Sequence, residues 1–265
     1  MKSNNLIAID LEIASTCNAA CPVCIRRQSG EVADFEQQMR TLDDVKRIFA
    51  GVGKQLQHIQ MCGNYGDPMT CAEILPICEW FKEQNPYVNI RIATNGGIGK
   101  PDHYRQLGKL GVEMVFGVDG ASTEILGLHR VNVNFDKAIN NMRAYMDAGG
   151  RGTWQYLVFE HNKHEVELAR QEAESIPSTF AVRKSTRNKE PWVSKIKQKV
   201  NGKIETKVIE INAPEDKKYK HSQVDKHAKL LDKKVFDNKK TVKENKLAKT
   251  IKCRLIHSSR AFLGY

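Results

Sequence analysis

The sequence predicts an α/β fold, a partial, TIM-like (β/α)6 barrel of parallel strands followed by a basic, partly irregular C-terminal extension. Two observations lead to this expectation. Up to about residue 185, short apolar runs rich in β-branched residues alternate with amphipathic stretches of helical length. Beyond that point the alternation stops and lysine dominates the composition.

Six apolar runs have the length and the β-branched content of strands that are buried on both faces of a parallel sheet. These expected strands are Leu6–Ile13, His58–Cys62, Asn89–Ala93, Val112–Val118, Trp154–Phe159 and Phe180–Lys184. Helices fit between them as right-handed crossovers. In such sheets the functional groups gather at the carboxyl ends of the strands.

Two of the intervening segments carry clear helix signals. Thr41 precedes Leu-Asp-Asp, which offers a side-chain N-cap followed by an acidic first turn. Phe135–Ala148 has apolar residues at helical spacing and runs into Gly149-Gly150, a common helix stop. We therefore expect one helix to begin just after Thr41 and another to occupy Phe135–Ala148.

Length and composition fit a chain with a sizeable core. The chain has 265 residues and is 40% hydrophobic, enough for one large domain or a domain with an appendage. Asp10 and Glu12 break the N-terminal apolar stretch, and no run approaches the length of a membrane span. We expect no membrane association and a reducing, cytoplasmic compartment, in which seven cysteines suggest metal or redox chemistry rather than disulfides.

The net charge of +11 is concentrated late in the chain. Residues 183–253 hold 22 Lys and Arg against 9 Asp and Glu, so the remainder is close to neutral. We expect a Lys-rich insert or linker here, with a hairpin around Asn201-Gly202. A solvated face is the simplest meaning of such a charge run, and contact with an anionic partner is the alternative.

Three cysteines stand close together just after the first expected strand. Cys17, Cys21 and Cys24 lie in the run CNAACPVC. Three thiolates at this spacing can hold three corners of one metal centre and leave one position open, which is where chemistry takes place. The residues alone also allow a disulfide, burial as small hydrophobes, or a zinc site.

Glycine, carboxylate and amide residues follow the next three expected strands. Gly66 and Asp67 follow the second strand, Thr94-Asn95 ends the third, and Gly117-Val118-Asp119-Gly120 ends the fourth, with Arg130 ten residues later. A ligand that contains an amino acid group and a ribose suits this set. A carboxylate would bind its ammonium, the arginine its carboxylate, and the second aspartate its ribose hydroxyls. The eight histidines show no pairing typical of metal ligands.

Over about residues 5–185 the chain resembles the radical S-adenosylmethionine (SAM) enzymes, because CNAACPVC matches their C-x3-C-x2-C signature. The resemblance implies that the three cysteines bind a 4Fe–4S cluster, whose fourth iron is chelated by the amino and carboxylate groups of SAM. It also implies that an external one-electron reductant drives cleavage of SAM to methionine and a 5′-deoxyadenosyl radical, which abstracts hydrogen from a substrate.

The resemblance further implies where SAM is held. The turn Tyr65-Gly66-Asp67 corresponds to the motif that contacts the amino group, Asp119 to the ribose contact, Arg130 to the partner of the carboxylate, and the strand ending near Val158 to the adenine contact. The expected cofactor-binding residues are Tyr65, Gly66, Asp67, Thr94, Asn95, Gly117, Asp119, Arg130 and Val158. Four positions depart from the family pattern: Tyr65 replaces a glycine, Asp67 replaces a glutamate, Gly117 lacks a hydroxyl that is often present, and Val23, before the third cysteine, is apolar but not the frequent aromatic.

The C-terminal run IKCRLIHSSRAFLGY resembles the start of an auxiliary cluster domain of the SPASM or twitch type, since ten residues separate Cys253 from Gly264. The expected organisation is therefore a radical SAM partial barrel over 1–185, a Lys-rich insert or linker over 186–252, and the start of an auxiliary domain over 253–265.

The likeness to auxiliary-cluster members favours a peptide or protein side chain as the substrate. A nucleotide or RNA substrate is the first alternative, but the Lys-rich segment has few aromatic residues for base stacking. A non-catalytic iron–sulfur or zinc-binding protein is the second alternative.

Overall fold

A computed structural model describes residues 7–24, 26–28, 31–32, 38–185, 192–200, 203–219, 250–254 and 262–264. Its centre is a sheet with the strand order β12-β11-β1-β4-β5-β6-β7-β8. The six strands expected from the sequence are all present in it, parallel to one another, as β1 (Ile7–Leu11), β4 (Leu56–Met61), β5 (Asn89–Thr94), β6 (Glu113–Gly117), β7 (Gly152–Val158) and β8 (Thr179–Lys184).

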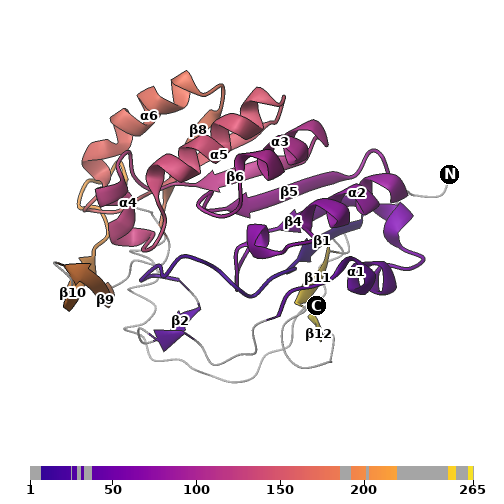
Figure 1. Ribbon diagram of the computed structural model, residues 1–265, viewed down its shortest axis with the longest axis horizontal. Coiled ribbons are helices and arrows are strands. Elements are labelled where there is room, and N and C mark those ends of the chain that lie inside the picture. The colour runs from indigo at the N-terminus through magenta and orange to yellow at the C-terminus, as the bar shows by residue number, and fades with distance from the viewer. Residues whose placement is uncertain are drawn as a thin grey trace.

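Helices connect these strands and lie along one side of the curved sheet (Figure 1). The helices are α1 (Leu42–Ile48), α2 (Ile74–Gln84), α3 (Pro101–Lys109), α4 (Thr123–His129), α5 (Phe135–Asp147) and α6 (Val166–Ser175), with short 3-10 turns η1 (Gly53–Gln55), η2 (Pro68–Thr70) and η3 (Lys163–Glu165). The α/β partial-barrel prediction is confirmed. None of the helices in the described residues has the length and apolar character needed to cross a membrane.

Both predicted helix boundaries are confirmed. The hydroxyl of Thr41 accepts a hydrogen bond from the backbone N–H of Asp44, and the Asp44 carboxylate accepts one from the Thr41 N–H, a complete capping box at the start of α1. Helix α5 ends one residue before Ala148, and Gly149 follows with a φ of 84°, which favours glycine.

Aromatic residues fill the core where the helices meet the sheet. The ring of Phe116 on β6 lies 5.9 Å from Tyr104 on α3 and 5.7 Å from Tyr145 on α5, measured between centroids. All three side chains are fully buried, and the Tyr145 hydroxyl donates to the carbonyl of Val112. This packing fixes the end of β6, where Gly117 is the last residue and Asp119 follows two residues later.

The later part of the chain adds strands that the sequence analysis only partly anticipated. Antiparallel strands β9 (Trp192–Val200) and β10 (Lys203–Ile211) pair with Val200 opposite Lys203, so the predicted hairpin is present, although its turn at 201–202 lies outside the described residues. Strand β11 (Thr250–Arg254) pairs in parallel with β1, with Cys253 opposite Leu11, and β12 (Phe262–Gly264) pairs antiparallel to β11. The division into three domains stays a prediction.

A two-stranded ribbon follows the cysteine run. It consists of β2 (Arg27–Gln28) and β3 (Glu31–Val32), which are antiparallel. The cysteines themselves lie in the loop between β1 and β2, at the carboxyl end of β1. The fold therefore places them beside the segments that leave β4, β5 and β6.

Candidate functional site

A cavity of about 460 Å³ opens at the carboxyl ends of the strands. Its wall contains all three cysteines of the CNAACPVC run and residues that end or follow β4, β5, β6 and β8. Of the residues singled out from the sequence, the wall includes Cys17, Cys21, Cys24, Gly66, Asp67, Thr94, Asn95, Gly117 and Arg130. Segments far apart in the sequence thus meet at one site.

The cysteine loop is anchored at several points. The backbone N–H of Ala19 donates to the sulfur of Cys17 over 3.3 Å, and the N–H of Ala20 donates to the carbonyl of Val131 over 2.9 Å. Val23, which precedes the third cysteine, is buried in a small apolar cluster with Phe159 and Ile211. The loop is therefore held between the segment after α4 and the end of β10.

The protonation of the thiols depends on burial and on nearby arginines. Burial raises the pKa of Cys21 to about 11, and Arg130 partly opposes this rise. Burial also raises the pKa of Cys17, with Asp67 adding to the effect, whereas Arg26 and Arg130 lower it. Both thiols are protonated at neutral pH without metal, so metal binding must release their protons.

The donor set fits an iron–sulfur cluster. Within the described residues, no three Cys, His, Asp or Glu side chains converge on a point where one metal ion could be held. Cluster ligation does not require this convergence, because each thiolate binds a different iron atom. Three cysteine thiols from one loop, facing a cavity large enough for a ligand, are the arrangement that such a cluster needs. Cys17, Cys21 and Cys24 would hold the cluster.

Gly66 lets two loops touch. A Cβ atom at this position would clash with the carbonyl oxygens of Ala14 and Thr16, lying 2.5 Å from the latter. The next residue, Asp67, donates its N–H to the carbonyl of Thr16 over 2.8 Å. The turn after β4 is thus joined by backbone contact to the residues that directly precede Cys17.

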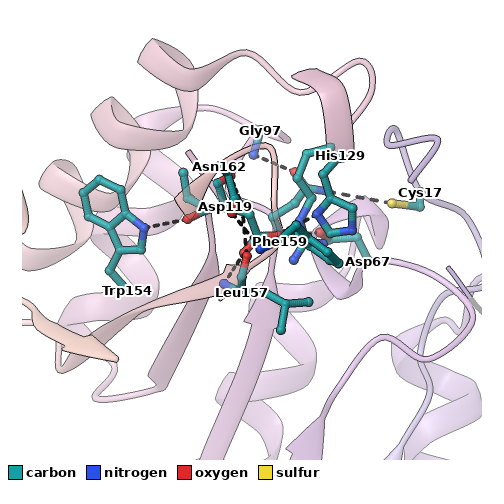
Figure 2. A network of polar contacts seen from close by, with 12 residues as sticks. Cys17, Asp67, Gly97, Asp119, His129, Trp154, Leu157, Phe159 and Asn162 are labelled. Carbon is teal, nitrogen blue, oxygen red and sulfur yellow. Dashed lines mark hydrogen bonds and ion pairs between the residues drawn. The ribbon is translucent and has the colours of Figure 1, made fainter. Parts of the chain in front are cut away.

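The Asp67 carboxylate is the centre of a hydrogen-bond network that reaches the first cysteine. It accepts hydrogen bonds from the N–H of Met69 (3.0 Å), the hydroxyl of Thr94 (3.0 Å) and the N–H of Asn95 (2.8 Å). The side-chain amide of Asn95 in turn lies 3.7 Å from the sulfur of Cys17, and Figure 2 shows Cys17 at one end of this network. Burial raises the pKa of Asp67, and these donors oppose the rise.

Asp119 is fully buried and lies behind the cavity wall rather than in it. Its Oδ2 atom accepts from Nε of Arg130 (2.7 Å) and from Nδ1 of His129 (3.0 Å), and its Oδ1 atom accepts from the N–H of Leu157 (2.7 Å; Figure 2). Burial by itself would raise the pKa of Asp119, but Arg130 and His129 outweigh it and hold the pKa at about 2. The ribose contact of Asp119 stays a prediction, and a ribose would have to compete with these three donors.

Two side chains near β7 fix the backbone around Asp119. The buried amide of Asn162 donates to the carbonyl of Asp119 and to that of Leu157, both over 3.0 Å. The indole N–H of Trp154 donates to the carbonyl of Val118 over 2.8 Å. These contacts hold the backbone on both sides of the Asp119 carboxylate in place (Figure 2).

Gly117 provides the space that Arg130 occupies. A Cβ atom at Gly117 would lie 2.7 Å from Nη2 of Arg130. The same guanidinium interacts electrostatically with the Cys21 thiol. The missing side chain at Gly117 is therefore explained by packing, and Arg130 links Asp119 to the cysteine loop.

Besides Asp119, two expected contacts lie outside the cavity wall. Tyr65 is half-buried and Val158 is fully buried, and neither lines the cavity. Their roles in SAM binding stay predictions.

His129 was not singled out from the sequence; its ring is 3% exposed, lines the cavity and lies 4.3 Å from that of Phe159 between centroids, tilted by 53°. Its position directly before Arg130 was the one feature of the sequence that could have marked His129 as a site residue. The analysis also missed Arg26, Arg183 and Lys184, which line the same wall.

A family profile described as the radical SAM superfamily matches residues 11–172. The chain belongs to the radical SAM superfamily. The match runs from the last residue of β1 into α6 and includes all three cysteines. Radical SAM proteins use a 4Fe–4S cluster and SAM as cofactors, in agreement with the donor set described above.

Solved structures with a similar fold include two of SuiB from Streptococcus suis. The structure of SuiB bound to precursor peptide SuiA has a TM-score of 0.55 and 14% identity, over 67% of this chain and 39% of that chain. A second SuiB structure has the same TM-score and identity, over 78% of this chain and 44% of that chain. This radical SAM chain thus spans less than half the length of the SuiB chains. No curated protein has significant sequence similarity to it.

Proposed function

We propose that this radical SAM chain binds a 4Fe–4S cluster through Cys17, Cys21 and Cys24, cleaves SAM reductively, and modifies a side chain of a peptide or protein. The observation that carries the proposal is the shared cavity. Three cysteines from a single loop line it together with a glycine–carboxylate turn and a partly buried arginine, all within the segment that matches the family.

When bound, the cluster and SAM supply a 5′-deoxyadenosyl radical that abstracts hydrogen from the substrate. The chain's own residues bind SAM and orient it. Arg130, held by Asp119, presents a guanidinium at the cavity wall that can receive the SAM carboxylate. Asp67 presents a carboxylate for the SAM ammonium.

Two observations support a peptide or protein substrate. SuiB, whose fold is similar, is bound to a precursor peptide in one of its structures. In addition, none of the described residues that line the cavity is Phe, Tyr or Trp, so the wall offers no aromatic platform for a nucleobase substrate. An external one-electron reductant is required as a partner.

The test is anaerobic reconstitution of the full chain with iron and sulfide, followed by SAM and dithionite, with 5′-deoxyadenosine as the product measured. Cys17→Ala, Cys21→Ala and Cys24→Ala serve as variants, and Cys78→Ala serves as a matched control, because Cys78 is fully buried in the core on α2. We expect the product from the wild type and the control and none from the other three.

Two results would overturn the proposal. A cluster that forms but never yields 5′-deoxyadenosine would identify a non-catalytic iron–sulfur protein. Zinc bound in place of iron, with no cluster after reconstitution, would identify a zinc-binding protein.

A further inference from the structure

We propose that Arg26, Arg183 and Lys184 form an anion-binding subsite, which receives a carboxylate side chain of an acidic peptide substrate. The inference rests on the proposed function, and it names a chemical class for the substrate. It starts from the charge of the cavity wall, which contains four Arg and Lys side chains but a single carboxylate among the described residues.

The three subsite residues reach the cavity from opposite ends of the barrel sequence. Arg26 lies two residues after the third cysteine of the loop at the end of β1. Arg183 and Lys184 are the last two residues of β8, and both are exposed. Because β1 and β8 are separated by four other strands in the sheet, the subsite is created by the curvature of the sheet and not by neighbouring strands.

These cations have no counter-charge in the described part of the chain. None of the three side chains makes an ion pair or a hydrogen bond with another described residue, whereas the fourth cation of the wall, Arg130, is paired with Asp119. Arg26 is only 8% exposed, and its buried Nε atom has no hydrogen-bond partner. Burial of an unpaired guanidinium is costly, which is the signature of a group that waits for an anionic ligand.

The carboxylate in the wall does not supply that counter-charge. Asp67 is buried and hydrogen-bonded by Met69, Thr94 and Asn95, and the proposed function assigns its negative charge to the SAM ammonium. The family's cofactors do not supply it either. SAM carries one carboxylate against a sulfonium and an ammonium, and an oxidised 4Fe–4S cluster with three thiolates has a net charge of only about −1, which offsets at most one of the three cations. At least two cations are therefore left for the substrate.

A peptide carboxylate suits this site better than a nucleic acid. Guanidinium and ammonium groups bind carboxylates and phosphates alike. A nucleotide substrate would also need a surface for its base, and the described wall has no Phe, Tyr or Trp to provide one. The subsite therefore favours Asp or Glu close to the modified residue.

The test measures binding by fluorescence anisotropy, with the full-length, cluster-reconstituted protein and SAM present. The probes are a labelled peptide with several glutamates, the same peptide with glutamines at those positions, and a labelled oligouridylate of equal length. We expect the glutamate peptide to bind at least about tenfold more tightly than the glutamine peptide, and its binding to weaken with added salt.

The main variant is Arg183→Gln/Lys184→Gln, and the matched control is Arg105→Gln/Lys109→Gln, which removes the same two charges from the exposed face of α3. Arg26→Gln is a third variant, and its iron content is measured to show that the cluster is retained. We expect the preference for glutamate to disappear in the main variant and in Arg26→Gln, and to persist in the control.

Several results would overturn the inference. Equal binding of the two peptides, including no measurable binding of either, excludes a carboxylate subsite. An unchanged preference in Arg183→Gln/Lys184→Gln places the site elsewhere, and tighter binding of the oligouridylate identifies a nucleic acid substrate. These outcomes are independent of the proposed function, which stands or falls on 5′-deoxyadenosine formation in the wild type.

Discussion

Arg130 and Asp119 form an ion pair that joins the core to the cavity, with Nε of Arg130 2.7 Å from Oδ2 of Asp119. The carboxylate is fully buried, whereas 22% of the arginine side chain is exposed. His129 donates to the same oxygen, since an ionised carboxylate can only accept. The direction of the guanidinium at the cavity wall is therefore set by a residue that does not itself line the cavity.

Asp119→Asn should weaken both the fold and SAM binding. The substitution leaves a largely buried guanidinium without its counter-charge, and removing one partner of a buried pair costs about 3–5 kcal/mol. We expect about 3 kcal/mol here, the lower end of that range, because Arg130 is partly exposed. Urea unfolding measures the loss of stability, and equilibrium dialysis of the reconstituted protein measures the affinity for SAM.

Asp102→Asn is the matched control, because it breaks an Arg–Asp pair at the surface of α3, where the Asp102 side chain is 77% exposed. We expect a change of no more than about 0.5 kcal/mol in the control. If the two variants lose equal stability, the buried pair does not have the role described above.

The contribution of Asp119 should depend on pH. Its pKa is about 2 in the folded chain, against 3.8 as the ordinary value. A depressed carboxyl pKa stabilises the folded state at pH values above the unfolded pKa, and this stabilisation is lost as the pH falls through the folded pKa. The difference in unfolding free energy between the wild type and Asp119→Asn should be constant from neutral pH to about pH 5, then shrink by about 2 kcal/mol towards pH 2. A difference that is the same at every pH would contradict the assignment.

Gly66→Ala should impair cluster incorporation. The added methyl group would meet the backbone oxygens of Ala14 and Thr16, and the loop before Cys17 would have to move. We expect a loss of about 1–3 kcal/mol in stability and a clear fall in iron bound per chain after reconstitution. Gly127→Ala, on α4, is the control, since a Cβ there meets nothing within 4 Å; it should bind iron as the wild type does. Normal iron content in Gly66→Ala would show that this contact does not position the cysteines.

Gly117→Ala should act on Arg130 more than on the fold. Its methyl carbon would lie 2.7 Å from Nη2, the end of a flexible side chain that can shift. We expect SAM affinity to fall about tenfold, roughly the loss of one charge-assisted hydrogen bond, while the urea midpoint changes little. An unchanged dissociation constant for SAM, measured by calorimetry, would argue that Arg130 does not receive the SAM carboxylate.

Much of this architecture could be predicted from local sequence patterns. Buried parallel strands are encoded by apolar, β-branched runs, so Asn89–Ala93 and Trp154–Phe159 were recognisable without a structure. The capping box at Thr41 is encoded within four residues. The pairing of β11 with β1 joins segments more than two hundred residues apart, and no local pattern specifies such a contact.

The sequence by itself determined the strand and helix order, the spacing of Cys17, Cys21 and Cys24, and the presence of glycines and carboxylates after the strands. These properties depend on neighbouring residues and on periodicity. Only the tertiary structure decided that Asp119 faces Arg130 behind the wall, that Gly117 makes room for that arginine, and that Arg26 meets Arg183 and Lys184 around one cavity. The direction of a side chain at a strand end depends on which distant segments pack against it, and that is fixed when the sheet curves and its carboxyl ends converge.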